Sequence, residues 1–205
     1  MVIKGMNGVK IFNNTFYSKQ TKYTAPGQGT ARGLIDIYMN RDIVPIGSAV
    51  GTKIFNNIFY TKNQITNIVI YDKECLSGFE SDYNLYYCEA GDPLFRIGGT
   101  TYTFKQWQAL GYDIHSKVIN PAFKDLINFV PATRLDYGKN LGSEYINGLS
   151  VASVWGINDP LTTPQNGTWQ VGAVVHAEQI NQPPVISLSS PSKSTSFVAP
   201  ATITI

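Results

Sequence analysis

The stretch "KIFNNTFY", Lys10–Tyr17, returns almost unchanged as "KIFNNIFY", Lys53–Tyr60. When the two residues before each stretch are included, the ten-residue segments agree at eight positions and lie 43 residues apart. A weaker third copy, "ESDYNLYY", ends at Tyr87, 27 residues after Tyr60. An internal repeat of this kind indicates a chain that passes through the same structural unit several times.

A second repeated segment explains why the two offsets differ. The segment "LIDIYMN" around Ile37 is similar to "NIVIYDK" around Ile70. The connections on both sides of Ile37 are longer than those around Ile70, and together they account for the whole difference between 43 and 27 residues. The same unit therefore occurs twice, once with two enlarged loops.

The repeated segments have the composition of β-strands. They are short, rich in Ile, Val, Phe, Tyr and Thr, and bounded by Gly, Pro, Asn and Asp. Strands that recur every ~20–30 residues without intervening helices are typical of a parallel β-helix, in which each coil stacks ~4.8 Å from the next. The sequence therefore predicts an all-β solenoid, with parallel β-helix coils over residues 1–103.

The repeated asparagines have a structural explanation in this fold. Asn14, Asn57 and Asn84 fall in one row when the copies are aligned. An amide side chain both donates and accepts, so each member can hydrogen-bond to its neighbours in adjacent coils. Asparagine also tolerates the left-handed backbone of a sharp corner. We expect this row to be architectural, although a binding role is an alternative.

The segment "TYTFKQWQALGYD" has a different character. Phe104, Trp107 and Leu110 are spaced as on one face of a helix, and Gly111 follows as a glycine cap. We therefore expect residues 104–180 to form a last coil and a cap that contains a short helix.

Several of these residues carry a resemblance to a known group of proteins. "DYNLYY", then Phe104 and Trp107, "GYDIHS" and "NPAF" resemble the C-terminal coils of bacterial extracellular right-handed parallel β-helix proteins, a superfamily of polysaccharide lyases and glycoside hydrolases. The closing "WQVGAV" is similar to the end of many such domains. Asn120 and Gln170 stand where that family usually has Asp. The resemblance spans roughly residues 8–176 and implies right-handed coils, a secreted protein and a carbohydrate ligand.

The last part of the chain changes composition again. Pro183 and Pro184 indicate an extended linker, and the strand-like "VISL" and "ATITI" resemble the opening of a bacterial Ig-like domain. Such a sandwich needs about seven strands, so residues 181–205 are interpreted as a linker and a truncated Ig-like start. Strand pattern also begins within the first ten residues without a cap. We therefore expect the chain to be a fragment, with any signal peptide upstream.

Composition excludes several classes of function. The chain has 205 residues, of which 43% are hydrophobic and 15% charged, and its net charge is +2. This is far less basic than phosphate-binding proteins usually are, so no nucleic-acid partner is expected. No stretch is apolar for long enough to predict a membrane span. Cys75 and Cys88 are expected to be free and buried. No metal or cofactor motif is present, and calcium, although possible in such a protein, is supported by no motif.

Catalytic candidates are weak. Asp42 and Glu74 flank the second type of strand together with Asp36 and Asp72, and the first two could fall on neighbouring coils. A glycosidase needs two carboxyl groups at a fixed separation, but solvated loop charges have the same pattern. His115 is a further candidate, with a hydrogen-bonded structural histidine as the alternative. Lys10 and Lys53 share a row whose third member, Glu80, interrupts a cationic track.

The enlarged loop from Ser18 to Gly33 is the most suggestive binding segment. Long loops on a rigid scaffold often carry function. Within it, the candidate sugar-binding residues are Lys19, Lys22, Tyr23 and Arg32.

Together these features predict a secreted protein, extracellular or on the cell surface, that is monomeric and binds or cleaves polysaccharide. Because no acid/base pair stands out, we do not expect this chain to be catalytically sufficient alone. The alternative is a non-catalytic adhesin or structural solenoid. A trimeric phage tailspike-like protein is a second rival.

Overall fold

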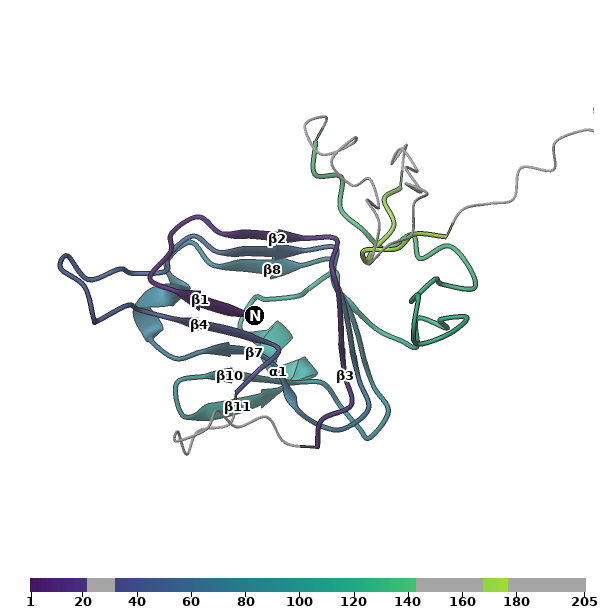
Figure 1. Cartoon of the computed structure of the whole chain (residues 1–205), viewed down its shortest axis with the longest axis horizontal. Coiled ribbons are helices and arrows are strands. Elements are labelled where there is room, and N and C mark those ends of the chain that lie inside the picture. The colour runs from purple at the N-terminus through teal and green to yellow at the C-terminus, as the bar shows by residue number, and fades with distance from the viewer. Residues whose placement is uncertain (22–31, 143–167, 177–205) are drawn as a thin grey trace, which may run out of the picture.

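The computed structural model describes residues 1–21, 32–142 and 168–176. It is mostly β, as expected, with three sheets of mostly parallel strands (Figure 1). The first sheet has the order β1 (Val2–Lys4), β4 (Ile35–Tyr38), β7 (Thr66–Ile70), β10 (Leu94–Ile97), β11 (Thr100–Thr103). The second has β2 (Lys10–Phe12), β5 (Lys53–Phe55), β8 (Glu80–Asp82). The third has β12 (Lys117–Val118), β9 (Leu85–Cys88), β6 (Ile58–Thr61), β3 (Thr15–Ser18).

The register of the strands is the one that the repeat predicts. In the second sheet Lys10 lies opposite Lys53, and Lys53 lies opposite Glu80. In the third sheet the row Phe16, Phe59, Tyr86 is aligned across three parallel strands. One passage through the three strand types therefore corresponds to the 43-residue and 27-residue offsets, an arrangement compatible with a β-solenoid.

One part of the region expected to form parallel coils is antiparallel. β10 and β11 form a hairpin, with Ile97 opposite Thr100. Its turn is Gly98–Gly99, and Gly98 has a φ of +56°. Two glycines between short strands favour a tight hairpin turn, because such turns need positive φ angles. The parallel stacking of the first sheet therefore ends at β10.

The predicted short helix is confirmed as α1 (Phe104–Ala109). Thr103 and Gln106 form a capping box at its start, and Gly111 follows its end with a φ of +95°. Trp107 is fully buried, whereas Leu110 is 46% exposed. Leu110 is the C-cap residue of the helix, directly before Gly111.

Rows of identical or similar side chains fill the interior. Ile3, Ile37, Ile70 and Ile97 form one buried row across the first sheet. The rings of Phe16 and Phe59 stack with centroids 4.9 Å apart, as do those of Phe59 and Tyr86. At the far end, Trp107 of α1 stacks on Phe95 at 4.8 Å. Each coil thus buries the apolar surface of its neighbour.

The segments 119–142 and 168–176 cover the outer face of the third sheet. Ile58 and Leu85 pack there with Leu135 and Val171 in a separate hydrophobic cluster. Within residues 168–176 the β pairing is limited to an isolated bridge between Gly138 and Trp169. The linker and Ig-like start assigned to residues 181–205 lie outside the described residues.

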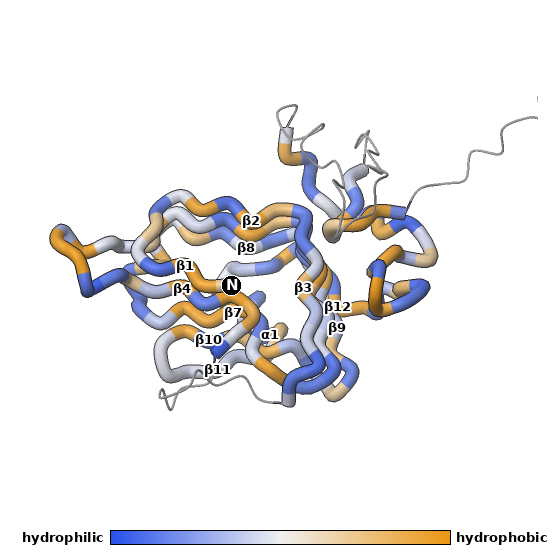
Figure 2. Tube along the Cα trace, in the orientation of Figure 1, coloured by the Kyte–Doolittle hydropathy of each residue, from blue (hydrophilic) through white to orange (hydrophobic). Residues whose placement is uncertain are grey.

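Hydropathy along the chain shows where apolar side chains are left outside the core. Figure 2 shows an apolar tip on the long loop that leaves β4, and there Ile43, Val44 and Ile46 are at least 49% exposed. The loop is closed at its base by a bridge between Asn40 and Gly47. No helix within the described ranges is long and apolar enough to cross a membrane.

Candidate functional site

A pocket of about 330 Å³ lies on the outer face of the first sheet, over β1, β4 and the end of β7. Side chains that point away from the core form its floor, and the loop after β4 supplies one wall. Its lining residues are Lys4, Arg32, Tyr38, Met39, Arg41, Asp42, Tyr71, Asp72.

The parallel register places the two tyrosines of the pocket side by side. Lys4 lies opposite Tyr38, and Ile37 lies opposite Ile70, so that Tyr38 and Tyr71 are neighbours at the ends of adjacent strands. Their rings are 5.7 Å apart and nearly perpendicular. Because the inward-facing row beside them is packed in the core, the two rings are held on a rigid surface.

Ion pairs hold the acidic side chains in and beside the pocket. Arg41 Nη2 lies 2.9 Å from Asp72 Oδ1, and Lys4 pairs with Asp42. Arg32, which lines the pocket, has its Nη1 3.4 Å from Asp36 Oδ2, and Asp36 is only 1% exposed. These pairs offset the charges of the carboxylates and of their cationic partners.

Two pKa shifts follow from these contacts. Burial raises the pKa of Asp72, but the hydrogen bond from the Met39 N–H and the ion pair with Arg41 outweigh burial, and the net shift is downward. The pKa of Tyr71 is raised, first by burial and then by the nearby charge of Asp36. Both shifts favour the ordinary charge states at neutral pH, in which Asp72 is an anion and Tyr71 a neutral phenol.

Two guanidinium groups lie over the ring of Tyr71. Arg96 Cζ is 5.0 Å and Arg32 Cζ 5.9 Å from its centroid, and Arg32 is also 5.8 Å from the centroid of Tyr38. Stacked cation–π contacts of this kind orient a guanidinium group without neutralising it. The outer face of the first sheet thus combines aromatic rings with oriented hydrogen-bond donors.

The structure brings some of the sequence candidates together in the pocket and separates others from it. Arg32 and Asp42 line it, and Asp72 lies beside them. Glu74 lies on the short helix η1 (Lys73–Leu76) and is exposed, outside the lining. Lys19 is exposed at the start of the enlarged loop. Lys22 and Tyr23 lie outside the described residues.

Sequence reasoning missed the two tyrosines of the pocket. Tyr38 and Tyr71 are the same residue at the same place in the two copies of the second strand type, "IDIY" and "IVIY". That coincidence was a detectable signal, but the pattern alone did not tell whether the tyrosines point inward or outward. Arg41 was missed because its loop differs between the copies.

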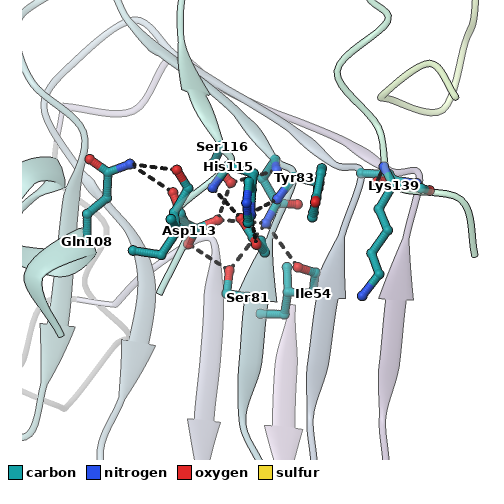
Figure 3. A network of polar contacts seen from close by, with 12 residues as sticks. Ile54, Ser81, Tyr83, Gln108, Asp113, His115, Ser116 and Lys139 are labelled. Atoms are coloured by element: carbon teal, nitrogen blue, oxygen red, sulfur yellow. Dashed lines mark hydrogen bonds and ion pairs between the residues drawn. The ribbon is translucent and has the colours of Figure 1, made fainter. Parts of the chain in front are cut away.

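His115 lies at another corner, beside the second and third sheets. Its Nδ1 is 2.6 Å from Asp82 Oδ2, and its ring stacks on Tyr83 at 4.7 Å (Figure 3). The Asp82 carboxylate also accepts the backbone N–H groups of His115 and Tyr83. These contacts explain the histidine as a residue that ties the 113–116 turn to β8.

The asparagine row lies in the same corner. Asn14 Nδ2 donates to Asn57 Oδ1 at 3.1 Å, and Asn57 Nδ2 donates to Asn84 Oδ1 at 3.1 Å. The backbone N–H groups of Asn14 and Asn57 donate to the same two oxygens. Every amide oxygen in these contacts therefore accepts from the coil before it, which gives the row a direction along the stack.

The row ends on a buried carboxylate, Asp113, drawn in Figure 3. Asp113 Oδ1 accepts from Asn84 Nδ2 at 2.9 Å and from Ser116 Oγ at 2.6 Å. Asp113 Oδ2 accepts from three further donors: Ser81 Oγ at 2.7 Å, Trp107 Nε1 at 2.7 Å and Tyr86 OH at 3.1 Å. Burial raises the pKa of Asp113, and these hydrogen bonds lower it, with a net upward shift. We call Asn57, Asn84, Asp113 and these donors the corner network.

One expectation about the asparagines was wrong. The left-handed backbone was assigned to the row Asn14, Asn57, Asn84, but the residues with positive φ are the preceding ones, Asn13 (52°), Asn56 (59°) and Tyr83 (55°). The two consecutive asparagines in each of the first two copies have different structural roles. The first asparagine adopts the positive φ that turns the chain. The second makes the side-chain hydrogen bonds between coils, because its side chain points into the corner.

Within the described ranges, no group of three His, Cys, Asp or Glu side chains is placed to hold a metal ion. Cys75 and Cys88 are free and buried, as expected. No family model, no curated protein and no solved structure matches this chain. Its function must therefore be inferred from the geometry of its own residues.

Proposed function

We propose that this chain is a unit of a secreted, carbohydrate-active, right-handed parallel β-helix protein, and that it binds polysaccharide in the pocket on the first sheet. The observation that carries the proposal is the pair of adjacent rings, Tyr38 and Tyr71, set among ion-paired side chains. Sugars offer apolar C–H faces to aromatic rings and hydroxyl groups to charged donors and acceptors. A pocket that presents both on rigid strands suits such a ligand.

The same geometry favours binding over cleavage. A general acid in a glycosidase needs a raised pKa, so that it holds a proton near neutral pH. The pKa of Asp72 is instead lowered by Arg41 and Met39, and Asp42 is paired with Lys4. Both carboxylates that line the pocket are therefore held in ion pairs, and their oxygens can also accept hydrogen bonds from sugar hydroxyl groups.

The stacking of coils also suits a chain-like ligand. Adjacent strands of a sheet are about 4.8 Å apart, so successive coils present equivalent positions at regular intervals along the solenoid. A polymer that runs along the stack meets Lys4, Tyr38 and Tyr71 in three successive coils. We propose that the protein acts in this way as an extracellular monomer.

The test is affinity electrophoresis of the purified chain in gels that contain different polysaccharides. Replacement of Tyr38 or Tyr71 by alanine removes a ring contact worth on the order of 1 kcal/mol, which corresponds to about a 5-fold loss of affinity. Tyr83→Asn is the matched control, because it removes an aromatic ring from another corner and places asparagine where Asn13 and Asn56 already adopt positive φ.

The proposal predicts retarded migration of the wild type and of Tyr83→Asn, and weaker retardation of both pocket variants. Equal migration of all four proteins in every gel would overturn it. Equal weakening in all three variants would also count against this pocket, since the loss would then not depend on its two rings.

A further inference from the structure

We infer that the free edge of the first coil is a docking surface, on which a partner polypeptide adds one further parallel coil. The coil that fits carries an asparagine at its corner and an aromatic residue two positions later. The surface lies at the end of the stack where β1, β2 and β3 each stand last in their sheet (Figure 1). Its role does not depend on the proposed binding of polysaccharide.

The backbone of β1 and β3 turns hydrogen-bonding groups toward this end. The side of β1 that faces β4 is marked by Met1 O, which accepts from the Asp36 N–H. The side of β3 that faces β6 is marked by Asn14 O, which accepts from the Ile58 N–H. Successive residues of a parallel strand turn their N–H and C=O groups to opposite sides. The free edge therefore carries the backbone groups of four residues: Val2, Lys4, Thr15, Tyr17.

The asparagine row opens on this edge with an acceptor. Asn57 Oδ1 accepts from the backbone N–H and the Nδ2 of Asn14, and Asn84 Oδ1 accepts from the same two groups of Asn57. Asn14 Oδ1 is the equivalent atom of the first coil, and in the part of the chain that the structure describes no hydrogen bond to it is found. The group that fits in front of Asn14 is therefore a donor, as an asparagine amide is.

The aromatic row gives the same edge an apolar centre. Phe59 and Tyr86 have no exposed surface, whereas Phe16, the first ring of the row, is only half-buried. Phe59 covers one face of the Phe16 ring at 4.9 Å, with the two planes 8° apart. In each coil the ring follows the row asparagine by two residues. A coil that places its asparagine on Asn14 would therefore bring an aromatic ring onto the other face of Phe16.

The chain itself has no spare segment of this kind. An asparagine followed two residues later by an aromatic residue occurs in the whole sequence only at Asn14, Asn57 and Asn84, all within the stacked coils. The segments 22–31, 143–167 and 177–205 do not contain the pattern. The coil that fits the edge therefore comes from a different polypeptide.

A second copy of the chain does not fit the edge either. At the opposite end of the stack the row closes on Asp113, whose two oxygens already accept from Asn84 and Trp107, so this end presents no asparagine donor for head-to-tail stacking. Two first coils placed face to face would bring two Asn14 oxygens together, and both are acceptors. A free strand edge with a directional acceptor thus selects a partner strand that brings the donor.

The experiment uses a peptide that copies residues 51–61, "GTKIFNNIFYT", with a short lysine tail for solubility. Its dye-labelled form is titrated with the full chain and followed by fluorescence anisotropy. A second peptide carries Asn57→Asp, which places a carboxylate in front of the Asn14 oxygen. Light scattering of the chain alone measures self-association.

Two variants at one position of the chain test the edge. Thr15→Pro removes an N–H group from the free side of β3, where proline is tolerated. Thr15→Val is the matched control, because it keeps that N–H group. Both variants lose the Thr15 hydroxyl, which accepts from the Ala173 N–H, so this loss cancels in the comparison. Circular dichroism verifies that each variant is folded.

The expected result is saturable binding of the first peptide by the wild type and by Thr15→Val. The Asn57→Asp peptide should bind about 10-fold more weakly or worse, because a donor is replaced by a charged acceptor. Thr15→Pro should weaken binding of the first peptide by about 5-fold or more, as the loss of a backbone hydrogen bond does. The chain alone should remain monomeric.

Four other outcomes overturn the inference. Equal binding of the two peptides would mean apolar adhesion without the asparagine contact. Equal binding by Thr15→Pro and Thr15→Val would place the peptide away from the edge. Binding of neither peptide would show that the edge accepts no such coil. A dimer of the wild type that Thr15→Pro abolishes would identify the occupant as a second copy.

Discussion

In the corner between the second and third sheets, Asn57, Asn84 and Asp113 have no exposed surface. In the pocket on the first sheet, by contrast, the side chains of Arg41 and Asp42 are 57% and 74% exposed. The asparagines of the corner network recur from coil to coil, whereas the loop that carries Arg41 and Asp42 is longer than the connection at the same place in the next coil. A buried polar position must match the coil below it, because an unsatisfied group there is costly. An exposed polar side chain can hydrogen-bond to water, so the residue at that position can differ from one coil to the next.

This contrast predicts where substitutions will act. Changes in the corner network should alter the stability of the whole stack, since each coil rests on its neighbour. Changes among the pocket side chains should alter binding with little effect on folding, because exposed ion pairs contribute little to stability. Three predictions, which use four substitutions, sharpen the comparison further, and they follow from the largest expected effect to the smallest.

The largest effect is expected for Asp113→Asn. Trp107 Nε1 and Asn84 Nδ2 donate to different oxygens of Asp113, and neither can accept. Whichever way the new amide turns, its NH₂ group meets one of these donors. We expect a loss of about 3–5 kcal/mol in the free energy of unfolding, measured by urea denaturation with tryptophan fluorescence.

Backbone strain does not confound this test, because Asp113 has a φ of +52°, which asparagine tolerates as well as aspartate. A loss below about 1 kcal/mol would mean that water or rearrangement satisfies the donors, and the contrast between corner and pocket would then be weaker than we describe.

The next largest loss of stability is expected for Asn57, in the middle of the asparagine row, and a smaller one for Asn14, its first member. Asn57→Ala removes donors to Ile11 O, Phe55 O and Asn84 Oδ1, and removes the oxygen that accepts from Asn14. Asn14 is only half-buried and donates to fewer groups. We expect losses of about 3 kcal/mol for Asn57→Ala and about 1 kcal/mol for Asn14→Ala in urea denaturation. Equal losses would contradict a row whose strength depends on burial.

The smallest effect belongs to the pocket and depends on pH. Because the pKa of Asp72 is lower in the folded chain than its ordinary value of 3.8, its contribution to stability is complete above pH 3.8 and is lost as the pH falls through the folded pKa. The difference in Tm between wild type and Asp72→Asn should therefore be constant from pH 5 to 7 and shrink toward zero below pH 3.8. Thermal scans by circular dichroism measure it, and a difference that grows on acidification would contradict the assigned shift.

The register could be predicted because it depends on local repetition. Lys10, Lys53 and Glu80 align as the two offsets require, and identical residues in successive coils leave few alternative pairings. The hairpin of β10 and β11 could not be predicted in the same way. Its strands resemble coil strands, and only the Gly98–Gly99 turn reverses the chain.

The candidate site was found only in part. Arg32 and Asp42 were selected from the sequence and do line the pocket, whereas Glu74 and His115 lie elsewhere. A strand alternates its side chains between two faces, and the sequence did not show which face of "IDIY" points inward. The tyrosines at the ends of these two strands were therefore overlooked.

The sequence by itself determined the repeat, the stacked rows and the mostly β character of this chain. Those properties follow from the demand that each coil match the one beneath it, so they appear in the sequence as a repeat. Tertiary structure alone decided that Lys4, Tyr38, Tyr71 and Arg96 would lie together on one face. These four residues come from four different strand regions of the first sheet, and only the parallel register brings their side chains into one neighbourhood. Their common position, and with it the proposed ligand, depends on long-range contacts that no local pattern encodes.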